Sequence, residues 1–414
     1  MEYQRYDEAV VEKTLVHQKT FYLHGNYSII GFYSKKKKPV SQRVMDIKEK
    51  DNKINLLEYD ADGLKAVVQG LGMKPYRAAQ ICRWIYSEGA DSFAAMTDIS
   101  RADRETLRKT AEIRPPELSE RLVSHDKTEK YLFSLQDGEK IESVLIPDEG
   151  RLTLCISSQA GCALGCRFCL TGAGGLRRNL LPHEITGQAL VAERLAAAWA
   201  APGQTAREGR YVTNIVMMGM GEPLMNAENV FEALKRLMSP KMFNISSRRI
   251  TLSTAGVAPG IKALGDSGLN VNLAVSVNAP NDEIRDRIMP INKKYPLKEL
   301  IKALKNYPLA PRRRITVEYV MLKGINDRVE HAAELGRLLR GLKCKINLIP
   351  FNEHAGSEFK RPEADSVLAF QERLHSMNYT AFIRESRGAD ILAACGQLRG
   401  ISARKTLTEA PPGV

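Results

Sequence analysis

The sequence predicts an α/β protein: an incomplete (βα)6-type barrel with a small N-terminal helical domain and a connecting β-hairpin. Three observations predict this fold. Apolar residues recur at helical spacing from about Asn55 to Ile113, and two alternating segments flank an Asp-Gly pair between Lys127 and Pro147. After Arg151, strand patterns alternate with helical patterns, which is typical of a parallel sheet or barrel.

Composition excludes several classes of protein. The 414 residues include 61 Lys+Arg and 48 Asp+Glu, a net charge of +13, and 43% are hydrophobic. No segment approaches the ~18–20 consecutive apolar residues of a membrane span, and the N-terminus has no signal-peptide pattern. We therefore expect a soluble cytoplasmic protein. The positive charge favours a polyanionic partner such as nucleic acid, without identifying one.

Residues 1–52 differ from the rest of the chain. They contain an aromatic and glycine-rich stretch followed by four consecutive lysines, Lys35 to Lys38. We expect a flexible, solvated extension. Met45 is a sensible alternative start of the compact protein, a hypothesis that a mass spectrum of native protein beginning at Met1 or Glu2 would contradict.

Residues 53–120 are predicted to form a small basic helical domain. Its first helix has apolar residues at Leu64, Val67, Val68 and Leu71, and Ser100 is a cap signal for its last helix. The basic residues that could contact phosphates are Lys74, Arg77 and Arg83, although a solvated face is the commoner role for such residues. Residues 121–150 follow as the hairpin linker, with Asp137-Gly138 at its turn.

The predicted barrel covers residues 151–395, and residues 396–414 form a C-terminal tail. Its candidate strands are Leu152–Ser157, Asn214–Met218, Arg249–Ser253, Val271–Val277, Ile315–Met321, Lys345–Ile349 and Thr380–Arg384. Helical patterns lie between them, including His183–Trp199, Ala227–Leu237, Pro296–Lys305 and His331–Leu342. No GxGxxG string opens a strand–helix unit, which disfavours a Rossmann-type enzyme.

Three of the seven cysteines form a CxxxCxxC triplet, Cys162, Cys166 and Cys169, directly after the first predicted barrel strand. Thiolates at this spacing can converge on one inorganic centre. Three ligands on a cube-shaped iron–sulfur cluster leave one iron open for substrate chemistry. The alternatives are a structural zinc site with a fourth ligand such as His183, and three unrelated buried thiols. An odd number of widely spread cysteines does not indicate a disulfide scaffold.

Several strings together carry a resemblance to a known family. The triplet after a first barrel strand resembles the radical S-adenosylmethionine (SAM) superfamily, in which three cysteines hold a 4Fe-4S cluster and SAM binds the fourth iron. Over roughly residues 53–405 the chain resembles, more narrowly, the RlmN family of dual-specificity RNA methyltransferases. The strings that carry this resemblance are IESVLIP, TLCISSQAGCALGCRFC, GMGEPLMN, TLSTAG, NAPNDEIRDRIMPINKKYP, KINLIPFN and RGADILAACGQL.

The resemblance implies a cofactor site at the carboxyl ends of the barrel strands, where barrel active sites lie. Cys162, Cys166 and Cys169 would hold the cluster. Gly221 and Glu222 would meet the amino group of SAM. Further SAM contacts would come from Ser253, Ser276, Val277, Asn278 and Asn352. Asn278 departs from the family, whose members commonly carry His there; Asn cannot be protonated near neutral pH, so any role that needs imidazole is in doubt.

The resemblance also assigns catalytic roles. Cys395 would carry a methyl group taken from one SAM, and a radical from a second SAM would remove a hydrogen from it, so that the methylene adds to adenine. Glu142 would remove the ring proton, and Cys155 would release the product through a transient disulfide with Cys395. By themselves, Cys395 and Cys155 read as buried thiols and Glu142 as a solvent-facing residue.

The implied activity is methylation of adenine carbon 2 in 23S rRNA, at the peptidyl transferase centre, and in tRNA, 3′ of the anticodon. Arg177-Arg178 and Arg312 to Arg314 would add phosphate contacts, and the target base would leave its stack. An electron donor such as flavodoxin or ferredoxin would reduce the cluster of a monomeric enzyme. The alternatives are a Cfr-type carbon-8 methyltransferase, a zinc-stabilised RNA-binding protein and a radical SAM enzyme for a small molecule.

Overall fold

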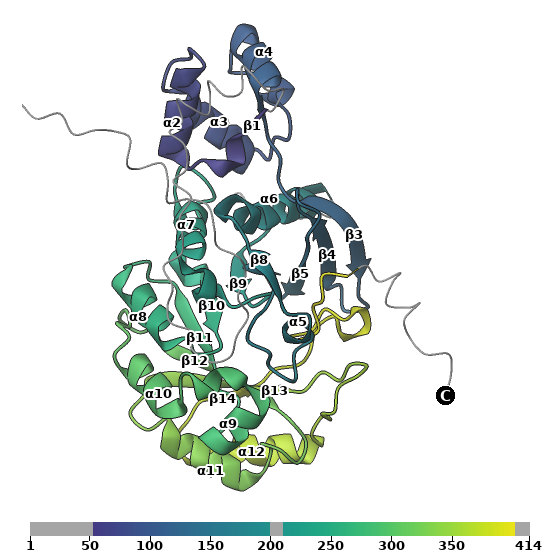
Figure 1. Cartoon of the computed structure of the whole chain (residues 1–414), viewed down its shortest axis with the longest axis vertical. Coiled ribbons are helices and arrows are strands. Elements are labelled where there is room, and N and C mark those ends of the chain that lie inside the picture. The colour runs from purple at the N-terminus through teal and green to yellow at the C-terminus, as the bar shows by residue number, and fades with distance from the viewer. Residues whose placement is uncertain (1–52, 199–209, 402–414) are drawn as a thin grey trace, which may run out of the picture. The chain divides into compact units, whose positions relative to one another are not determined.

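A computed structural model describes residues 53–198 and 210–401 (Figure 1). The expected N-terminal extension, with its lysine run and Met45, and the end of the tail from residue 402 lie outside the described residues. Within the two described ranges, no helix has the length and apolar character needed to cross a membrane.

The core of the fold is a ten-stranded mixed sheet in the order β14-β13-β12-β11-β10-β9-β6-β5-β4-β3. From β6 to β14 neighbouring strands pair in parallel, whereas β3, β4, β5 and β6 pair antiparallel. The parallel strands are β6 (Arg151–Cys155), β9 (Asn214–Met217), β10 (Ile250–Thr254), β11 (Asn272–Ser276), β12 (Ile315–Met321), β13 (Cys344–Pro350) and β14 (Ala381–Ile383). The structure therefore confirms all seven predicted barrel strands, and the sheet stays open as an incomplete barrel.

Helices follow these strands and pack against one another along the chain (Figure 1). They are α6 (Pro182–Ala198), α7 (Ala227–Met238), α8 (Ala258–Asp266), α9 (Asp282–Ile288), α10 (Leu297–Lys305), α11 (Val329–Leu338) and α12 (Ala364–Ser376). The four helices predicted between the strands are α6, α7, α10 and α11. β12 is buried along almost its whole length, as expected for a parallel strand covered on both faces.

The N-terminal helices are α2 (Ala61–Gly70), α3 (Arg77–Tyr86) and α4 (Arg101–Thr110), beside a short pair of strands, β1 (Ile54–Asn55) and β2 (Ala111–Glu112). Ser100 caps α4, since its side chain accepts a hydrogen bond from the Asp103 N–H at 3.1 Å. Two arginines of barrel helices, Arg194 of α6 and Arg236 of α7, bond to backbone carbonyls of this region. The helical segment is therefore fastened to the barrel through polar contacts as well as a shared apolar core.

The predicted hairpin is formed by β4 (Glu129–Ser134) and β5 (Lys140–Asp148), with the Asp137-Gly138 turn between them. Its description as a connecting linker is incomplete. β3 (Glu117–Val123) pairs with β4, and β5 pairs with the first barrel strand through Val144 and Cys155. The hairpin therefore extends the main sheet and lies directly beside the strand that leads to the cysteine triplet.

Several basic side chains proposed for phosphate contacts have protein partners. Arg178 bonds to Asp137 and to both oxygens of Glu184, and these carboxylates raise the pKa of its guanidinium. Arg77 pairs with Asp103 at 2.9 Å and Arg83 pairs with Asp98 at 2.7 Å, whereas Arg313 donates to Asn272 and Ser247. Arg178 is thus paired within the protein, and its contact with phosphate stays a prediction.

Arg285 of α9 is the largest fully buried side chain among the described residues. Its guanidinium donates to backbone carbonyls at the ends of two barrel strands and at the approach to α10, and to the Asn292 side chain. The acceptors are the carbonyls of Ala255, Ser276, Val277 and Tyr295 and Oδ1 of Asn292. Burial lowers the pKa of Arg285 to about 10, so the group is charged at neutral pH.

We predict that Arg285→Lys destabilises the protein by about 3–5 kcal/mol, because an ammonium cannot reproduce this fork of hydrogen bonds and leaves buried carbonyls unpaired. Urea unfolding of the apoprotein measures the change. The matched control is Arg287→Lys on the exposed face of the same helix, which should cost less than about 0.5 kcal/mol. Equal effects of the two substitutions would contradict the prediction.

Candidate functional site

The cysteine triplet lies in a loop between two short antiparallel strands, β7 (Gln159–Gly161) and β8 (Leu176–Asn179), with one helical turn, α5 (Leu170–Ala173), inside it. Cys162 donates its N–H to the Gly175 carbonyl at 2.8 Å, which closes the loop. Gly161 has φ +80°, and a Cβ at this position would lie 2.0 Å from the Gly175 oxygen. Only glycine therefore fits at the start of the loop.

The three thiols lie close enough for their charges to affect one another. Burial is the main cause that raises the pKa of Cys162 to about 12, and it also raises the pKa of Cys166. The negative charges of Cys169 and Glu222 raise both further, whereas Arg285 lowers the pKa of Cys166. Without a metal the Cys162 and Cys166 thiols are therefore protonated at neutral pH, and a bound centre would have to displace their protons.

The three thiols of the loop fit an iron–sulfur cluster by their chemistry. Across the described residues, no group of three or more His, Cys, Asp or Glu side chains converges closely enough to hold one metal ion, and this includes the triplet with His183. Thiolates at three corners of a cube lie farther apart than the ligands of one tetrahedral ion. Three free thiols in one loop are the donor set that an iron–sulfur cluster takes, and that these three cysteines hold one stays a prediction.

Glu222 lies beside this loop, at the start of the 3-10 helix η4 (Pro223–Asn226) after β9. Its carboxylate accepts the N–H of Leu224 at 3.0 Å and that of Ala255 at 2.7 Å. Burial raises its pKa to about 7, and these hydrogen bonds offset part of the increase. Gly221 has φ +100°, and a Cβ there would lie 2.5 Å from Cβ of Gln159, so this tight approach requires glycine.

The remaining predicted cofactor residues lie at the same edge of the sheet. Ser253 is near the end of β10, Ser276 ends β11, and Asn352 follows β13. The N–H of Val277 donates to the Glu318 carbonyl at 3.1 Å, which joins the end of β11 to β12. Ser253 and Asn352, 99 positions apart in the chain, thus lie at the same edge of the sheet, as expected for a barrel site.

The structure explains why Asn is accepted at position 278. Its φ is +56°, in the left-handed region that Asn tolerates better than most residues. Its side-chain oxygen accepts the Val320 N–H at 2.9 Å, and its amide approaches the Met289 sulfur at 3.2 Å. The side chain is therefore occupied by the protein itself, and a direct contact of this side chain with SAM stays a prediction.

Cys395 is placed beside the cysteine loop by its neighbours in the chain. The Gly396 carbonyl accepts the Leu170 N–H at 2.7 Å, and the Leu398 carbonyl accepts the Thr171 hydroxyl at 2.6 Å. The Asn352 amide reaches the Cys395 carbonyl at 3.5 Å. The Cys395 side chain is exposed to solvent, while the protein that surrounds its other sides, with the charges of Glu318 and Cys169, raises the pKa of its thiol to about 11.

Cys155, at the end of β6, is buried and is a neighbour of Cys395. Burial raises the pKa of its thiol, and the charge of Cys395 contributes as well. All seven cysteines, each within the described residues, are free thiols. The disulfide expected between Cys155 and Cys395 is therefore not supported.

Glu142 of β5 is buried, with 1% of its surface exposed, which corrects the reading of this residue as solvent-facing. Its carboxylate accepts the backbone N–H groups of Arg399 at 2.6 Å and Gly400 at 3.0 Å. The ammonium of Lys130 lies 3.2 Å from its other oxygen. The segment that carries Cys395 therefore continues directly onto Glu142.

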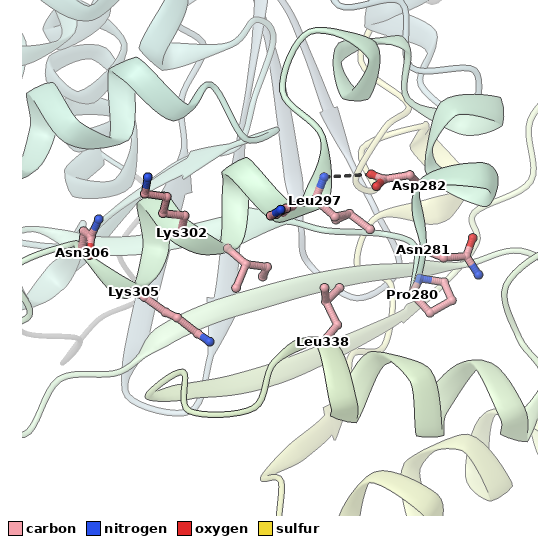
Figure 2. A pocket seen from close by; sticks show the side chains of 10 residues that line it. Pro280, Asn281, Asp282, Leu297, Lys302, Lys305, Asn306 and Leu338 are labelled. Atoms are coloured by element: carbon pink, nitrogen blue, oxygen red, sulfur yellow. Dashed lines mark hydrogen bonds between the residues drawn. The ribbon is translucent and has the colours of Figure 1, made fainter.

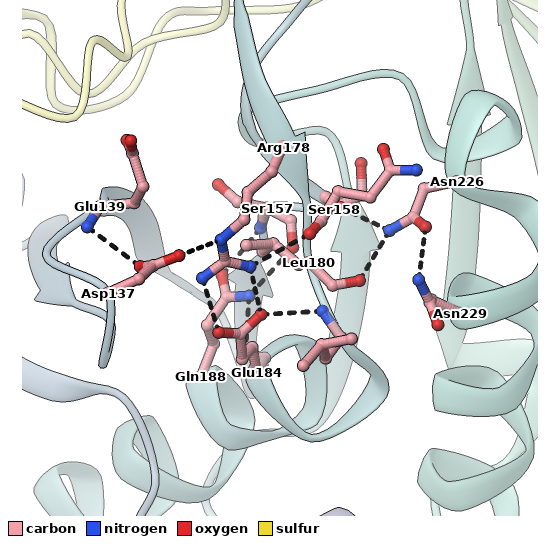
Figure 3. Close-up of polar contacts among 12 residues, drawn as sticks. Asp137, Glu139, Ser157, Ser158, Arg178, Leu180, Glu184, Gln188, Asn226 and Asn229 are labelled. Carbon is pink, nitrogen blue, oxygen red and sulfur yellow. Dashed lines mark hydrogen bonds and ion pairs between the residues drawn. The ribbon is translucent and has the colours of Figure 1, made fainter. Parts of the chain in front are cut away.

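A hydrogen-bond network behind these residues sets the relative positions of β5, β6 and η4 (Figure 3). The Ser157 hydroxyl donates to the Glu142 carbonyl at 2.6 Å and accepts the Met220 N–H at 2.8 Å. Gln188 of α6 bonds to both backbone groups of Ser157. Asn226 donates to the Ser158 and Leu180 carbonyls, so the two ends of the cysteine-loop region are tied to η4.

Sequence reasoning missed three residues that organise this site: Lys130, Gln159 and Arg285. Gln159 accepts the Glu222 N–H at 2.8 Å and so joins the cysteine loop to the Gly-Glu turn. A lysine within an apolar alternating strand was the available signal for Lys130. Arg285 lies in one of the strings that carry the family resemblance. A charged residue is usually exposed, so nothing in the sequence indicated that Arg285 is buried.

A cavity of about 560 Å³ lies elsewhere, against α10 (Figure 2). Three lysines of α10 contribute to its lining, and Asp282 accepts the Leu297 N–H at 2.8 Å at one end. None of the predicted site residues lines it. The cavity is therefore separate from the cysteine site.

We predict that Glu222 makes the apoprotein less stable as pH rises from about 4.5 to about 7. Its pKa is raised from 4.5 to about 7 in the folded state, so folding binds a proton in this window, and the full effect is about 3 kcal/mol. Glu222→Gln removes the titration. Urea unfolding at pH 5, 6 and 7 should therefore give a shallower decline for the variant, and parallel declines would contradict the prediction.

We also predict that the Cys395 thiol reacts slowly with iodoacetamide at pH 7 in the reduced apoprotein. Because its pKa is about 11, the rate should rise about tenfold per pH unit up to pH 10 without levelling off. Peptide mass spectrometry follows Cys395 separately from the buried Cys82 and Cys344. A rate that levels off below pH 9 would show an ordinary thiol.

Comparison with known proteins agrees with this geometry. Residues 54–113 match the family model of the ribosomal RNA large subunit methyltransferase N-terminal domain, and residues 156–336 match that of the radical SAM superfamily. The chain is 48% identical over 349 residues to a dual-specificity RNA methyltransferase RlmN of Syntrophus aciditrophicus (strain SB), covering 84% of this chain and 97% of that protein.

A second RlmN, from Paramagnetospirillum magneticum (strain ATCC 700264 / AMB-1), is 50% identical over 358 residues, covering 86% of this chain and 78% of that one. Among solved structures, a radical SAM methyltransferase from Sphaerobacter thermophilus superposes with a TM-score of 0.79 at 40% identity, covering 84% of this chain and 100% of the other. The chain belongs to the RlmN family of dual-specificity RNA methyltransferases within the radical SAM superfamily.

Proposed function

We propose that this enzyme methylates carbon 2 of adenine in 23S rRNA, at the peptidyl transferase centre, and in tRNA, at the adenosine 3′ of the anticodon. The observation that carries the proposal is the path of residues 392–400. This segment contacts the cysteine loop through Gly396 and Leu398 and contacts Glu142 through Arg399 and Gly400. A carrier thiol, a candidate cluster site and a candidate proton acceptor therefore adjoin one another.

The cluster would be held by Cys162, Cys166 and Cys169, and SAM by Gly221, Glu222, Ser253, Ser276, Val277, Asn278 and Asn352. When bound, the cluster and two molecules of SAM per turnover supply one methyl group and one hydrogen-abstracting radical. Glu222, whose pKa of about 7 leaves much of it ionised at neutral pH, pairs with the ammonium of SAM. The exposed Cys395 carries the methyl group, and its thiol has to lose a proton first.

Glu142 accepts the ring proton at carbon 2, and Cys155 is the second thiol, which releases the product from Cys395. A radical route suits this carbon because it is a poor nucleophile and does not displace a methyl group from SAM directly. The target adenosine has to leave its stack to reach Cys395. The enzyme acts as a cytoplasmic monomer, and an electron donor such as flavodoxin or ferredoxin reduces the cluster.

The test is a reconstitution. Anaerobically purified protein is examined by visible spectroscopy and metal analysis, then incubated with SAM, a reductant and an rRNA fragment or tRNA, and the nucleosides are identified by mass spectrometry. We expect an iron-containing brown protein that forms 2-methyladenosine. Cys395→Ala and Glu142→Gln should lower the yield at least about 100-fold, because each removes a group needed in every turnover. Cys344→Ala, a buried thiol away from the site, is the matched control.

Three other outcomes would contradict the proposal in different ways. An 8-methyladenosine product would indicate Cfr-type chemistry. A colourless zinc protein without a modified nucleoside would make the triplet structural. Full activity of Cys395→Ala would agree with RNA as the substrate but would show that Cys395 does not carry the methyl group.

A further inference from the structure

A buried ion pair joins β4 to β5 next to the proposed proton acceptor. The Lys130 ammonium lies 3.2 Å from Oε1 of Glu142, and their side chains are 10% and 2% exposed. Lys130 is paired with Val144 and Glu142 with Leu132, so the two charged residues are diagonal neighbours on one face of the sheet. Burying a lysine costs free energy unless its ammonium is paired, and here the ammonium is paired with the Glu142 carboxylate.

The same ammonium also holds the segment that carries Cys395. Lys130 Nζ donates to the Leu392 carbonyl at 3.2 Å, three residues before Cys395. Oε2 of Glu142 accepts the N–H groups of Arg399 and Gly400, which follow it. Leu392 has φ +51°, an unfavourable conformation for a leucine that the surrounding contacts must maintain. The ion pair therefore contacts the segment on both sides of Cys395: Lys130 before it and Glu142 after it.

The two oxygens of Glu142 have different surroundings. Oε2 accepts two backbone N–H groups, whereas the recorded partner of Oε1 is Lys130. A carboxylate oxygen with one partner retains a lone pair that can accept a proton. The adjacent ammonium, 3.2 Å from Oε1, offsets part of the cost of burying the Glu142 side chain and fixes the direction in which Oε1 points.

We propose that Lys130 is a positioning residue for proton removal: its ammonium holds Oε1 of Glu142 in a fixed relation to the Cys395 segment. The inference rests on the proposed function, because it assigns Glu142 as the proton acceptor and Cys395 as the methyl carrier. Lys130 acts through the two groups that it contacts, the Glu142 carboxylate and the Leu392 carbonyl. Its loss slows the step in which the ring proton leaves more than it slows methyl transfer to Cys395, because methyl transfer does not use Glu142.

The test separates the two steps in the cluster-loaded enzyme. Methylation of Cys395 with SAM alone is followed by protein mass spectrometry, and formation of 2-methyladenosine and of a covalent RNA–protein species is followed in the full reaction. The variants are Lys130→Met and Lys130→Arg. The matched control is Ser124→Ala, which removes a 2.5 Å hydrogen bond to Asp390 and loosens the same segment without touching Glu142.

We expect Lys130→Met to slow formation of 2-methyladenosine about tenfold or more relative to its rate of Cys395 methylation, and to accumulate the covalent RNA–protein species. Lys130→Arg keeps the cation, so its ratio of 2-methyladenosine formation to Cys395 methylation should be close to that of the wild type. Ser124→Ala should slow both steps by a similar factor. If Lys130→Met and Ser124→Ala have the same ratio of 2-methyladenosine formation to Cys395 methylation, Lys130 only holds the segment in place. That result would overturn the proposal.

A second measurement needs no activity. Amide hydrogen exchange of residues 392–400 in the apoprotein should be faster in Lys130→Met and near the wild-type rate in Lys130→Arg. Unchanged exchange in Lys130→Met would overturn the proposal, because Lys130 would not hold the segment. Wild-type protein that forms no 2-methyladenosine would overturn the proposed function and this inference together, whereas an active wild type with a normal Lys130→Met step ratio would overturn this inference alone.

Discussion

The edge of the sheet that carries the site depends on one buried cation, the guanidinium of Arg285. It bonds to carbonyls just past the ends of β10 and β11, where the candidate SAM residues lie. From the same helix, the Ile288 carbonyl accepts the Arg167 N–H of the cysteine loop at 3.0 Å. The ends of two strands and the cysteine loop are thus joined to the same helix, α9. Because the acceptors of Arg285 are backbone carbonyls, their spacing is set by the planar fork of the guanidinium and not by side-chain packing.

The second organising feature is the return of the chain to the sheet at residues 388–400. This segment bonds to the β3–β4 turn through Gly388 and Asp390, to the cysteine loop through Gly396 and Leu398, and to Glu142. Cys395 remains exposed among these contacts while Cys155 stays buried beside it. In the proposed function, the exposed Cys395 thiol can reach RNA, whereas the buried Cys155 thiol is shielded from other reagents.

Much of the fold was predictable because it is encoded locally. Parallel strands buried on both faces read as apolar runs, so all seven barrel strands were found within a few residues, and the cap of Ser100 followed from its position before a helical pattern. What the local patterns missed depends on partners elsewhere in the chain. Arg178 pairs with Asp137 and Glu184, and Glu142, which by itself reads as solvent-facing, is covered by a segment 257 residues away. No local pattern reports such partners.

By itself, the sequence determined the order of elements, the cysteine triplet in its glycine-rich loop and membership of a family, because spacing and short-range sterics act over a few residues. Only the tertiary structure decided that Lys130 pairs with Glu142, that Cys395 lies beside Cys155, and that the Asn278 side chain bonds to Val320. These contacts follow from sheet register and from where the chain returns after more than 200 residues. The physical reason is that periodicity specifies which face a residue occupies, whereas its partner is set by packing of distant elements.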